Sequence, residues 1–356
     1  MEYCITEFVG MDIGDKYCHI CIIDEDGEVT ENSRIRTNEK GIANYFSQRS
    51  RMRVVMEVGT HSPWISRLVD KLGHEIFVAN ARKLKLISGN TKKTDKVDPE
   101  LLARLGRSDP KLLFPIQHRK EAAQKDLAVV RSRAALVRTR SSLINHVRGI
   151  VKSAGYRLPS CSAESFHKLM DTIPENLTDS VEPVMKSIAL LTTTIRTLDR
   201  TIETLSKTKY PETKHLRTIP GVGPITALTF VLTLEDPHRF NKNRSIGAYL
   251  GLCPRKAQSG KKDPELRITK AGDRYLRTLL VSCANYILGP FGPDSYLKRF
   301  GDRLTERGGK WAKKRAVVAV ARKLAVLLVR LWKTGDVYDP FYPNSHIITE
   351  QKHQAA

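Results

Sequence analysis

The first eighty residues carry an order of strand and helix signals that few folds satisfy. Three strand-like runs, at residues 8–13, 17–23 and 29–36, are separated only by the short turns Gly14-Asp15-Lys16 and Asp24-Glu25-Asp26-Gly27. This spacing predicts an antiparallel meander of three strands. The chain is then expected to alternate between helix and strand, with helices near 41–49 and 63–72 and strands at 54–57 and 75–79.

Three meander strands followed by alternating helices and strands is the order of elements in a ribonuclease H-like or RuvC-like α/β fold. In that fold the catalytic acids come from the first strand, a later central strand and a terminal helix. Acids occupy the matching places here: Asp12 ends the first strand, Glu57 ends the fourth, and Asp95 and Asp98 precede the apolar stretch at 101–105. We therefore expect three separate segments to converge on one site.

Four carboxylates in one site are typical of a metal-dependent nuclease. Two Mg²⁺ ions prefer hard oxygen ligands and can activate a nucleophile and stabilise a leaving oxygen at a phosphodiester. Each acid also has a structural explanation. Asp12 could close a turn, Glu57 could face solvent, Asp95 could balance neighbouring lysines, and Asp98, followed by Pro99, could simply cap a helix.

The net charge of +22 is unevenly distributed along the 356 residues. Residues 1–110 hold 17 Lys/Arg and 17 Asp/Glu, whereas residues 111–356 hold 43 and 21. The part with the carboxylates is thus neutral and the rest is strongly cationic. Cationic side chains gain affinity for phosphate backbones by releasing counterions, so this division predicts chemistry in one part and nucleic-acid binding in the other.

The cysteines form no disulfide or zinc framework. Six are scattered along the chain, and the CxxC spacing of Cys18 and Cys21 has no second pair to complete a zinc site. We expect these two to be small apolar residues of a strand. Cysteines of this kind predict a protein of a reducing compartment.

No membrane segment is expected either. Glu2 and Glu7 stand where a signal peptide would be positive, and the apolar helix predicted at 316–331 is interrupted by Arg322 and Lys323. The sequence therefore predicts a cytoplasmic protein without a membrane partner.

Two long helical patterns occupy residues 118–208. In the second, apolar residues recur at steps of four and three, as in a coiled coil: Val184, Ile188, Leu191, Ile195, Leu198, Ile202 and Leu205. The first helical pattern has the same spacing at Leu127, Val130, Ala134, Val137, Ser141 and Ile144. The two helices could pair within one chain as an antiparallel hairpin or between chains, and the regular pattern favours an oligomer.

The third region is predicted to be mainly helical and basic. Gly221 and Gly223 in Ile219-Pro220-Gly221-Val222-Gly223 have the spacing of a helix-hairpin-helix turn, whose amides can hold a phosphate; a turn without a ligand is the alternative. Residues 239–333 carry 23 Lys/Arg against six Asp/Glu. We expect the main DNA or RNA surface here.

Several segments together resemble one known family. They are Gly10-Met11-Asp12-Ile13, Met56-Glu57-Val58-Gly59-Thr60, Lys93-Thr94-Asp95-Lys96-Val97-Asp98, Ile219-Pro220-Gly221-Val222-Gly223, Gly251-Leu252-Cys253-Pro254-Arg255, Ser259-Gly260 and Thr269-Lys270-Ala271-Gly272 with Leu276-Arg277. In this order the chain resembles insertion-sequence transposases that combine a RuvC-like DEDD domain with a serine-bearing transposase domain, the bridge-RNA-guided recombinases.

The resemblance implies roles that the residue pattern does not provide. Asp12, Glu57, Asp95 and Asp98 would bind Mg²⁺, and Ser259 would attack DNA and become attached to a 5′ phosphate. Partners would be donor and target DNA, a structured bridge RNA, and further copies in a dimer that pairs into a tetramer. The loop serine alone would be read as a turn residue. Candidate nucleic-acid contacts are Gly221, Gly223, Arg255, Lys256, Lys261, Lys262, Arg267, Lys270 and Arg274.

These observations predict four segments and three competing functions. The segments are a catalytic domain at 1–115, a coiled coil at 116–208, a serine-bearing basic domain at 209–335 and a tail at 336–356. The leading prediction is a recombinase that uses serine as the nucleophile. The alternatives are a junction-resolving or other hydrolytic nuclease that uses water, and an architectural nucleic-acid-binding protein whose acids are structural.

Overall fold

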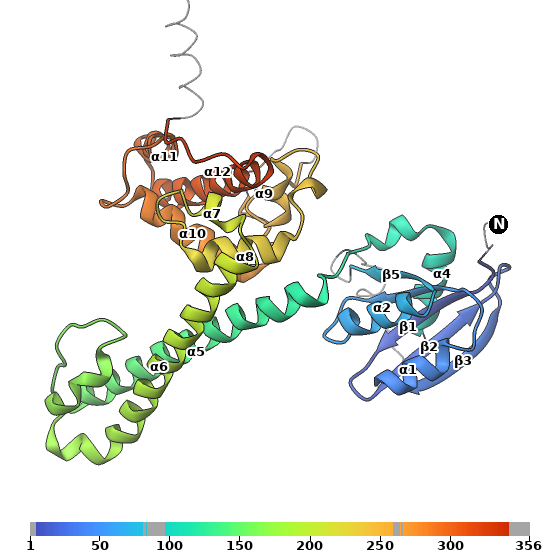
Figure 1. The fold of residues 1–356 in the computed structure, drawn as a ribbon, viewed down its shortest axis with the longest axis horizontal. Coiled ribbons are helices and arrows are strands. Elements are labelled where there is room, and N and C mark those ends of the chain that lie inside the picture. The colour runs from blue at the N-terminus through green and yellow to red at the C-terminus, as the bar shows by residue number, and fades with distance from the viewer. Residues whose placement is uncertain (1–4, 81–82, 84–96, 259–263, 265, 342–356) are drawn as a thin grey trace, which may run out of the picture. The chain divides into compact units, whose positions relative to one another are not determined.

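The chain folds into two compact units, Met1–Arg119 and Lys120–Ala356 (Figure 1). The computed structural model describes residues 5–80, 83, 97–258, 264 and 266–341. Unit 1 is built around a β-sheet, and unit 2 consists mainly of helices. Each unit has a hydrophobic core of its own.

The sheet of unit 1 has five strands in the order β3-β2-β1-β4-β5. β1 (Phe8–Ile13), β2 (Tyr17–Ile23) and β3 (Val29–Arg36) form the antiparallel meander. β4 (Arg53–Glu57) and β5 (Glu75–Ala79) join it in parallel with β1. All five predicted strands are confirmed, and the mixed sheet is consistent with the expected RuvC-like domain.

Helices cover both faces of this sheet. α1 (Glu39–Phe46) and α2 (Ser62–Lys71) pack on one face, where their apolar residues meet Val9 and Met11. α4 (Val97–Ser108) packs on the other, against β1, β2 and β4. Because side chains alternate along a strand, odd and even positions of β1 enter different cores.

Two helix starts differ from the prediction. α1 begins at Glu39 because the side chain of Asn38 accepts a hydrogen bond from the Gly41 amide at 2.7 Å, a cap that the sequence reading missed. α4 already includes Val97, so Asp98 lies in the first helical turn, and its assignment as the N-cap is wrong. Its negative charge is still favourable there, beside the unpaired amides of the helix start.

Unit 2 begins with a helical hairpin. α5 (Glu121–Ser153) and α6 (Thr178–Thr208) are joined through η2 (Phe166–Thr172) and η3 (Glu175–Leu177). Arg133 binds Asp199 and Arg140 binds Thr192, so the helices run antiparallel within one chain. This is the first of the two pairings that the sequence left open.

The buried stripe of the hairpin differs in part from the predicted one. Ile188, Ile195 and Ile202 are buried, one in every seven residues, but the predicted Leu191 and Leu198 between them are only half-buried. Met185 and Thr192 are buried in their place, and Ser141 of α5 is exposed. The buried residues of α6 from Val181 to Ser206 still follow steps of three, four and seven, so the stripe keeps the heptad spacing and lies one residue beyond the predicted leucines.

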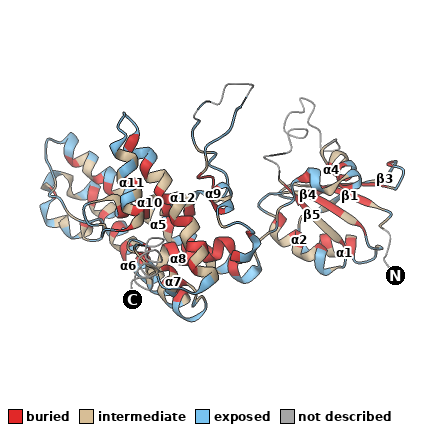
Figure 2. Cartoon of the chain, turned by 90° about the horizontal axis from the view of Figure 1, so that it is seen from above, coloured by how far each residue is buried: buried red, intermediate tan, exposed pale blue. Residues whose placement is uncertain are grey.

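The rest of unit 2 is a helical bundle around α8. Its elements are α7 (Thr213–Leu216), α8 (Pro224–Leu234), η4 (Pro237–Arg239), α9 (Ser245–Tyr249), α10 (Arg274–Leu288), α11 (Tyr296–Glu306) and α12 (Ala312–Thr334). Every residue of α8 from Thr226 to Leu234 is buried (Figure 2). The predicted helices at 226–234 and 316–331 are confirmed. Within the described ranges, no helix is both long and apolar enough to span a membrane.

Candidate active site

Asp12 and Glu57 end neighbouring strands on the same face of the sheet. β1 and β4 are parallel, and Gly10 pairs with Val55. Asp12 and Glu57 each follow that pair by two residues, which returns both side chains to the face of Gly10 and Val55. That face is the one covered by α4, because Val55 packs against Leu102. The two carboxylates, both half-buried, therefore share one edge and one face.

The start of α4 reaches this face through a close backbone contact. A Cβ placed on Gly10 would lie only 1.8 Å from the carbonyl oxygen of Pro99, so only glycine permits the approach. Asp98, which precedes Pro99, thereby lies where α4 meets β1. Its Oδ1 atom is buried and has no hydrogen-bond partner in the described part of the chain. A buried carboxylate oxygen without a donor is costly unless a cation satisfies it.

The donor chemistry at this edge suits Mg²⁺. Asp12, Glu57 and Asp98 offer hard carboxylate oxygens, and Asp98 Oδ1 accepts no hydrogen bond from any residue that the structure describes. The described residues nevertheless contain no group of three or more His, Cys, Asp or Glu side chains close enough to hold a metal ion. Asp95, the fourth predicted ligand, lies outside the described residues.

One side chain next to Asp12 was not predicted from the sequence. His19 of β2 pairs directly with Asp12 across the antiparallel ladder and therefore points to the same face. Cys18 lies on the opposite face; burial, partly offset by its hydrogen bond to Thr37 and reinforced by the charge of Asp12, raises the pKa of its thiol. Only the strand register identifies His19 as a neighbour of the acids.

Cys18 and Cys21 do not form a metal site. Three residues apart on one strand, they point to opposite faces: Cys18 lies in the core beneath α1 and α2, and Cys21 packs with Ala103 of α4. The prediction that they are apolar strand residues is confirmed.

A serine–histidine contact in unit 1 has a structural role. Ser62 Oγ lies 2.9 Å from His118 Nε2 but also accepts from the amide of Gly59 and donates to its carbonyl oxygen. It is fully buried, so no substrate phosphate can reach it. Burial, together with the charges of Arg67 and Arg119, lowers the pKa of His118. This pair fixes the turn that follows Glu57.

In unit 2, a short two-stranded ribbon bounds the segment with the predicted nucleophile. Pro254 and Ile268 form an antiparallel bridge, the Arg255 amide donates to the Arg267 carbonyl at 3.0 Å, and the Thr269 amide donates to Cys253 at 2.9 Å. Ser259, Lys261 and Lys262 lie outside the described residues. The other predicted basic contacts of this region are solvent-exposed: Arg255, Lys256, Arg267, Lys270 and Arg274.

The ribbon ends in a tightly packed turn. A Cβ on Gly251 would lie 2.2 Å from the Ala271 amide nitrogen, and one on Gly272 would lie 2.1 Å from the Tyr249 carbonyl oxygen. Both glycines have positive φ, and Lys270 between them adopts φ 56°, which a non-glycine residue rarely does. The guanidinium of Arg277 donates to the Ala271 carbonyl at 2.7 Å. The turn is thus held from several sides.

The predicted double-glycine turn joins α7 to α8. Gly221 has φ +88° and lies against the ring of Tyr286, where an added Cβ would come within 2.6 Å. Gly223 is the N-cap of α8, and Pro224 follows at the first helical position. Both glycines are exposed, so the turn is accessible although α8 itself is buried. α7 has only four residues, and a helix-hairpin-helix motif stays a prediction.

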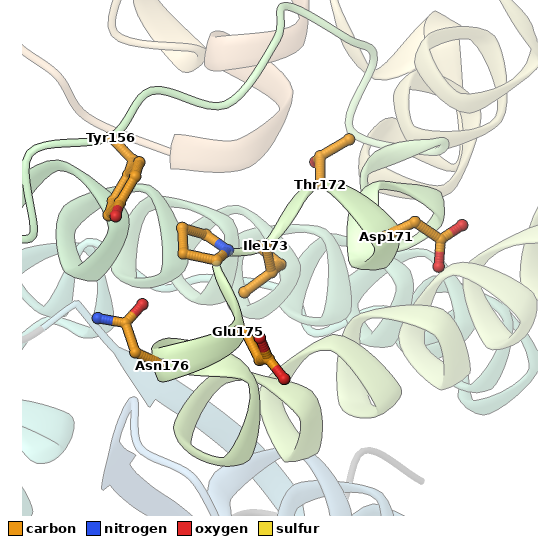
Figure 3. A pocket seen from close by; sticks show the side chains of 7 residues that line it. Tyr156, Asp171, Thr172, Ile173, Glu175 and Asn176 are labelled. Carbon is orange, nitrogen blue, oxygen red and sulfur yellow. The ribbon is translucent and has the colours of Figure 1, made fainter.

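A cavity of ≈ 720 Å³ opens in the segment between α5 and α6 (Figure 3). The seven residues that line it include the carboxylates of Asp171 and Glu175 and no lysine or arginine. Negative charge without a cation repels phosphate, so this cavity does not suit a nucleic acid.

Comparison with known proteins fits both units. A transposase model of the DEDD type from IS110 matches residues 9–155, and a model described as "Transposase IS116/IS110/IS902 family" matches residues 213–295. The two together span well over half of the chain. The chain belongs to the IS110 family of transposases.

Several curated relatives of this IS110-family chain span most of its length. A transposase for insertion sequence element IS1111A from Coxiella burnetii is 28% identical over 93% of this chain and 91% of its own length. A transposase for IS1328 from Yersinia enterocolitica is 27% identical over 78% and 82%. A pilin gene-inverting protein from Moraxella bovis is 23% identical over 93% and 97%.

Proposed function

We propose that this transposase is a Mg²⁺-dependent recombinase that cleaves DNA with Ser259 as the nucleophile and rejoins it through a phosphoserine intermediate. The observation that carries the proposal is the alignment of Asp12 and Glu57 on one face of neighbouring parallel strands, under the helix whose first turn contains Asp98. An IS110-family transposase acts on DNA, so a cluster of acids in its DEDD domain is best explained by phosphodiester chemistry.

Asp12, Glu57, Asp95 and Asp98 would hold the metal. When bound, Mg²⁺ supplies positive charge that makes a hydroxyl group more acidic and neutralises the charge gained by a phosphate in reaction. Asp12 and Glu57 would confine that charge to one edge of the sheet. Without metal they repel one another, and each must then rely on its protein neighbours.

The proposed step exchanges one phosphate ester for another. Ser259 Oγ forms a bond to phosphorus and loses its proton, while the bond from phosphorus to the 3′ oxygen breaks. The 3′ oxygen leaves with a proton as a hydroxyl, and the 5′ phosphate stays on the serine. Because one ester replaces another, the bond energy is retained, and a 3′ hydroxyl can reverse the step on a new partner strand.

The name of the Moraxella relative favours strand rejoining over hydrolysis. A protein that inverts a gene must reseal both strands after cutting them. A phosphoserine supports resealing without an outside energy source, whereas a water nucleophile leaves free ends. We therefore rank the serine mechanism above the hydrolytic nuclease.

The test is covalent trapping. Wild-type protein is incubated with Mg²⁺ and a nicked suicide DNA that carries the end of its insertion sequence, and a protein–DNA adduct is sought on denaturing gels. We expect an adduct that disappears in Ser259→Ala and in the absence of Mg²⁺. Free 5′-phosphate product without any adduct would eliminate the serine mechanism and favour the hydrolytic nuclease.

Variants of the acids distinguish an enzyme from an architectural protein. Asp12→Asn and Glu57→Gln are expected to abolish cleavage while DNA binding persists. Full activity in both variants would support the architectural alternative. A mixture of Asp12→Asn and Ser259→Ala proteins adds a test of the oligomer: recovered cleavage would mean that acids and serine come from different chains.

We also propose that a structured RNA guides target choice and that the active form is a dimer that assembles into a tetramer. The cationic 239–333 region supports a polyanionic partner of this kind. Purification from the native host, followed by sequencing of bound RNA, tests the first point. Recovery of no discrete RNA from active complexes would refute it.

A further inference from the structure

Unit 2 contains a second, larger cavity of ≈ 1540 Å³. Its walls are α12, the start of α11, and both strands of the ribbon that bounds the segment with Ser259, at Pro254 and at 266–268. Small-molecule pockets in proteins are typically about 300–1,000 Å³. The cavity therefore has room for part of a polymer as well as for a small ligand.

The side chains that line this cavity carry mostly positive charge and therefore favour an anionic ligand. Eight of its lining residues are Lys or Arg, and the only carboxylate among the lining residues is Asp339. Five of the cations are on α12: Lys314, Arg315, Arg322, Lys323 and Arg330. Such an excess of one sign favours a phosphate-bearing ligand.

Aromatic rings lie among these cations. The Lys323 ammonium donates to Tyr296 Oη at 2.6 Å and lies 4.4 Å and 4.0 Å from the ring centroids of Tyr296 and Phe300. Those two rings already interact with a cation. The Trp311 ring also has cations near it, with Lys314 Nζ 4.6 Å and Lys310 Nζ 5.8 Å from its centroid. It differs from the two half-buried rings because 52% of its surface is exposed, which leaves room for a further planar group.

Cations beside an exposed indole match the requirements of single-stranded nucleic acid. Phosphates bind the cations, and an unstacked base gains roughly 1–3 kcal/mol from an aromatic face. A base inside a duplex stays stacked on its neighbours and cannot use the ring. The lining thus favours an unpaired nucleotide over a duplex.

We propose that this cavity binds an unpaired nucleotide of the DNA strand beside the cleaved phosphate, with its base against Trp311 and its phosphates against the cations of α12. DNA is the favoured occupant because the wall is the ribbon from which the Ser259 segment extends. This inference rests on the proposed serine mechanism, since that mechanism brings a DNA strand to the ribbon. The cavity would keep the strand unpaired at the point of exchange.

The experiment measures binding without cleavage. Full-length protein in EDTA is titrated into a fluorescein-labelled oligothymidine of ~12 nucleotides, within the usual site size for single strands, and anisotropy is recorded. Trp311→Ala should weaken binding about 5- to 100-fold. Trp311→Phe should retain most of the affinity, and affinity for a duplex of the same length should be unchanged. Lys314→Gln should lower the slope of log affinity against log salt by about 0.7.

Phe291→Ala is the matched control, because Phe291 is 83% exposed in the same unit and does not line the cavity. Equal binding by the Trp311→Ala and Phe291→Ala proteins would overturn the proposal. So would a Trp311→Ala defect that affects oligouridine and not oligothymidine, because the occupant would then be RNA.

Failure of this inference can be told from failure of the proposed function. An intact covalent adduct with no effect of Trp311→Ala on oligothymidine overturns only the cavity. If Trp311→Ala weakens oligothymidine binding while the wild-type protein forms no covalent adduct, the cavity is supported and the serine mechanism is overturned.

Discussion

Gly10→Ala should separate the helix that carries Asp98 from the strand that carries Asp12. The new Cβ would lie 1.8 Å from the Pro99 carbonyl oxygen and 2.7 Å from the Ala103 amide nitrogen, whereas real Cβ contacts stay beyond 3.0 Å. Both obstacles are backbone atoms and cannot rotate away. The start of α4 must therefore move by more than about 1 Å.

The expected cost follows from two opposing effects. Overpacking of this kind costs about 1–3 kcal/mol, while replacing a strand glycine recovers only about 0.5–1 kcal/mol of chain entropy. The clash therefore prevails. A catalytic group displaced by ~1 Å can lose about 100-fold in rate, so cleavage should fall by that order.

Two other glycines provide graded controls. At Gly106 the nearest atom is the side-chain Cγ2 of Val55, 2.4 Å from a new Cβ, and Val55 is fully buried with a stiff β-branched side chain. The gain of about 1 kcal/mol from alanine in a helix offsets this overpacking only in part, so Gly106→Ala should lose stability but leave the Gly10–Pro99 contact in place. Gly59, just after Glu57, has no atom within 4 Å of a new Cβ, and Gly59→Ala should change stability by less than about 0.5 kcal/mol.

Hydrogen exchange on the full-length protein provides the assay, because it reports the stability of β1 and α4 separately from unit 2. Mn²⁺-induced protection of the same peptides reports metal binding, since a ligand stabilises the state that binds it. Gly10→Ala should lower protection in both segments and reduce the Mn²⁺ effect. If Gly10→Ala behaves like Gly59→Ala, the reasoning about α4 is wrong.

Three further predictions concern other sites. Asp12→Asn should leave the fold intact but remove Mn²⁺-induced protection of β1; protection equal to wild type would argue against a metal at Asp12. The pKa of His118 is lower in the folded protein than in the unfolded chain, so the unfolded chain takes up the imidazole proton more readily. Unit 1 should therefore lose stability as pH falls from about 6.5 towards the pKa of the folded state. Urea unfolding of the wild type at several pH values, compared with His118→Asn, measures this loss. Arg140→Met should leave stability unchanged or raise it by about 1–4 kcal/mol, because the buried guanidinium has an unsatisfied Nε. If the variant instead unfolds at a lower temperature, the Arg140–Thr192 hydrogen bond stabilises the protein by more than the burial of the guanidinium costs.

Much of unit 1 follows from local signals. Except for the polar β3, the strands are short and mainly apolar. An acid at the end of such a run, such as Glu57, can be recognised in the sequence without any tertiary contact. Helix boundaries were less accurate. The start of α1 depends on the Asn38 cap, and α4 begins one residue before Asp98.

The sequence alone determined the succession of strands and helices along unit 1, the placement of acids at strand ends and the division between a neutral and a cationic part. Tertiary structure decided which side chains meet. The register of β1 with its neighbours aligns Asp12 with His19 and turns Glu57 to the same face. Packing between α11, α12 and the ribbon creates a cationic cavity from segments far apart in the chain. Register and packing depend on contacts between distant residues, and such contacts have no local signature in a single sequence.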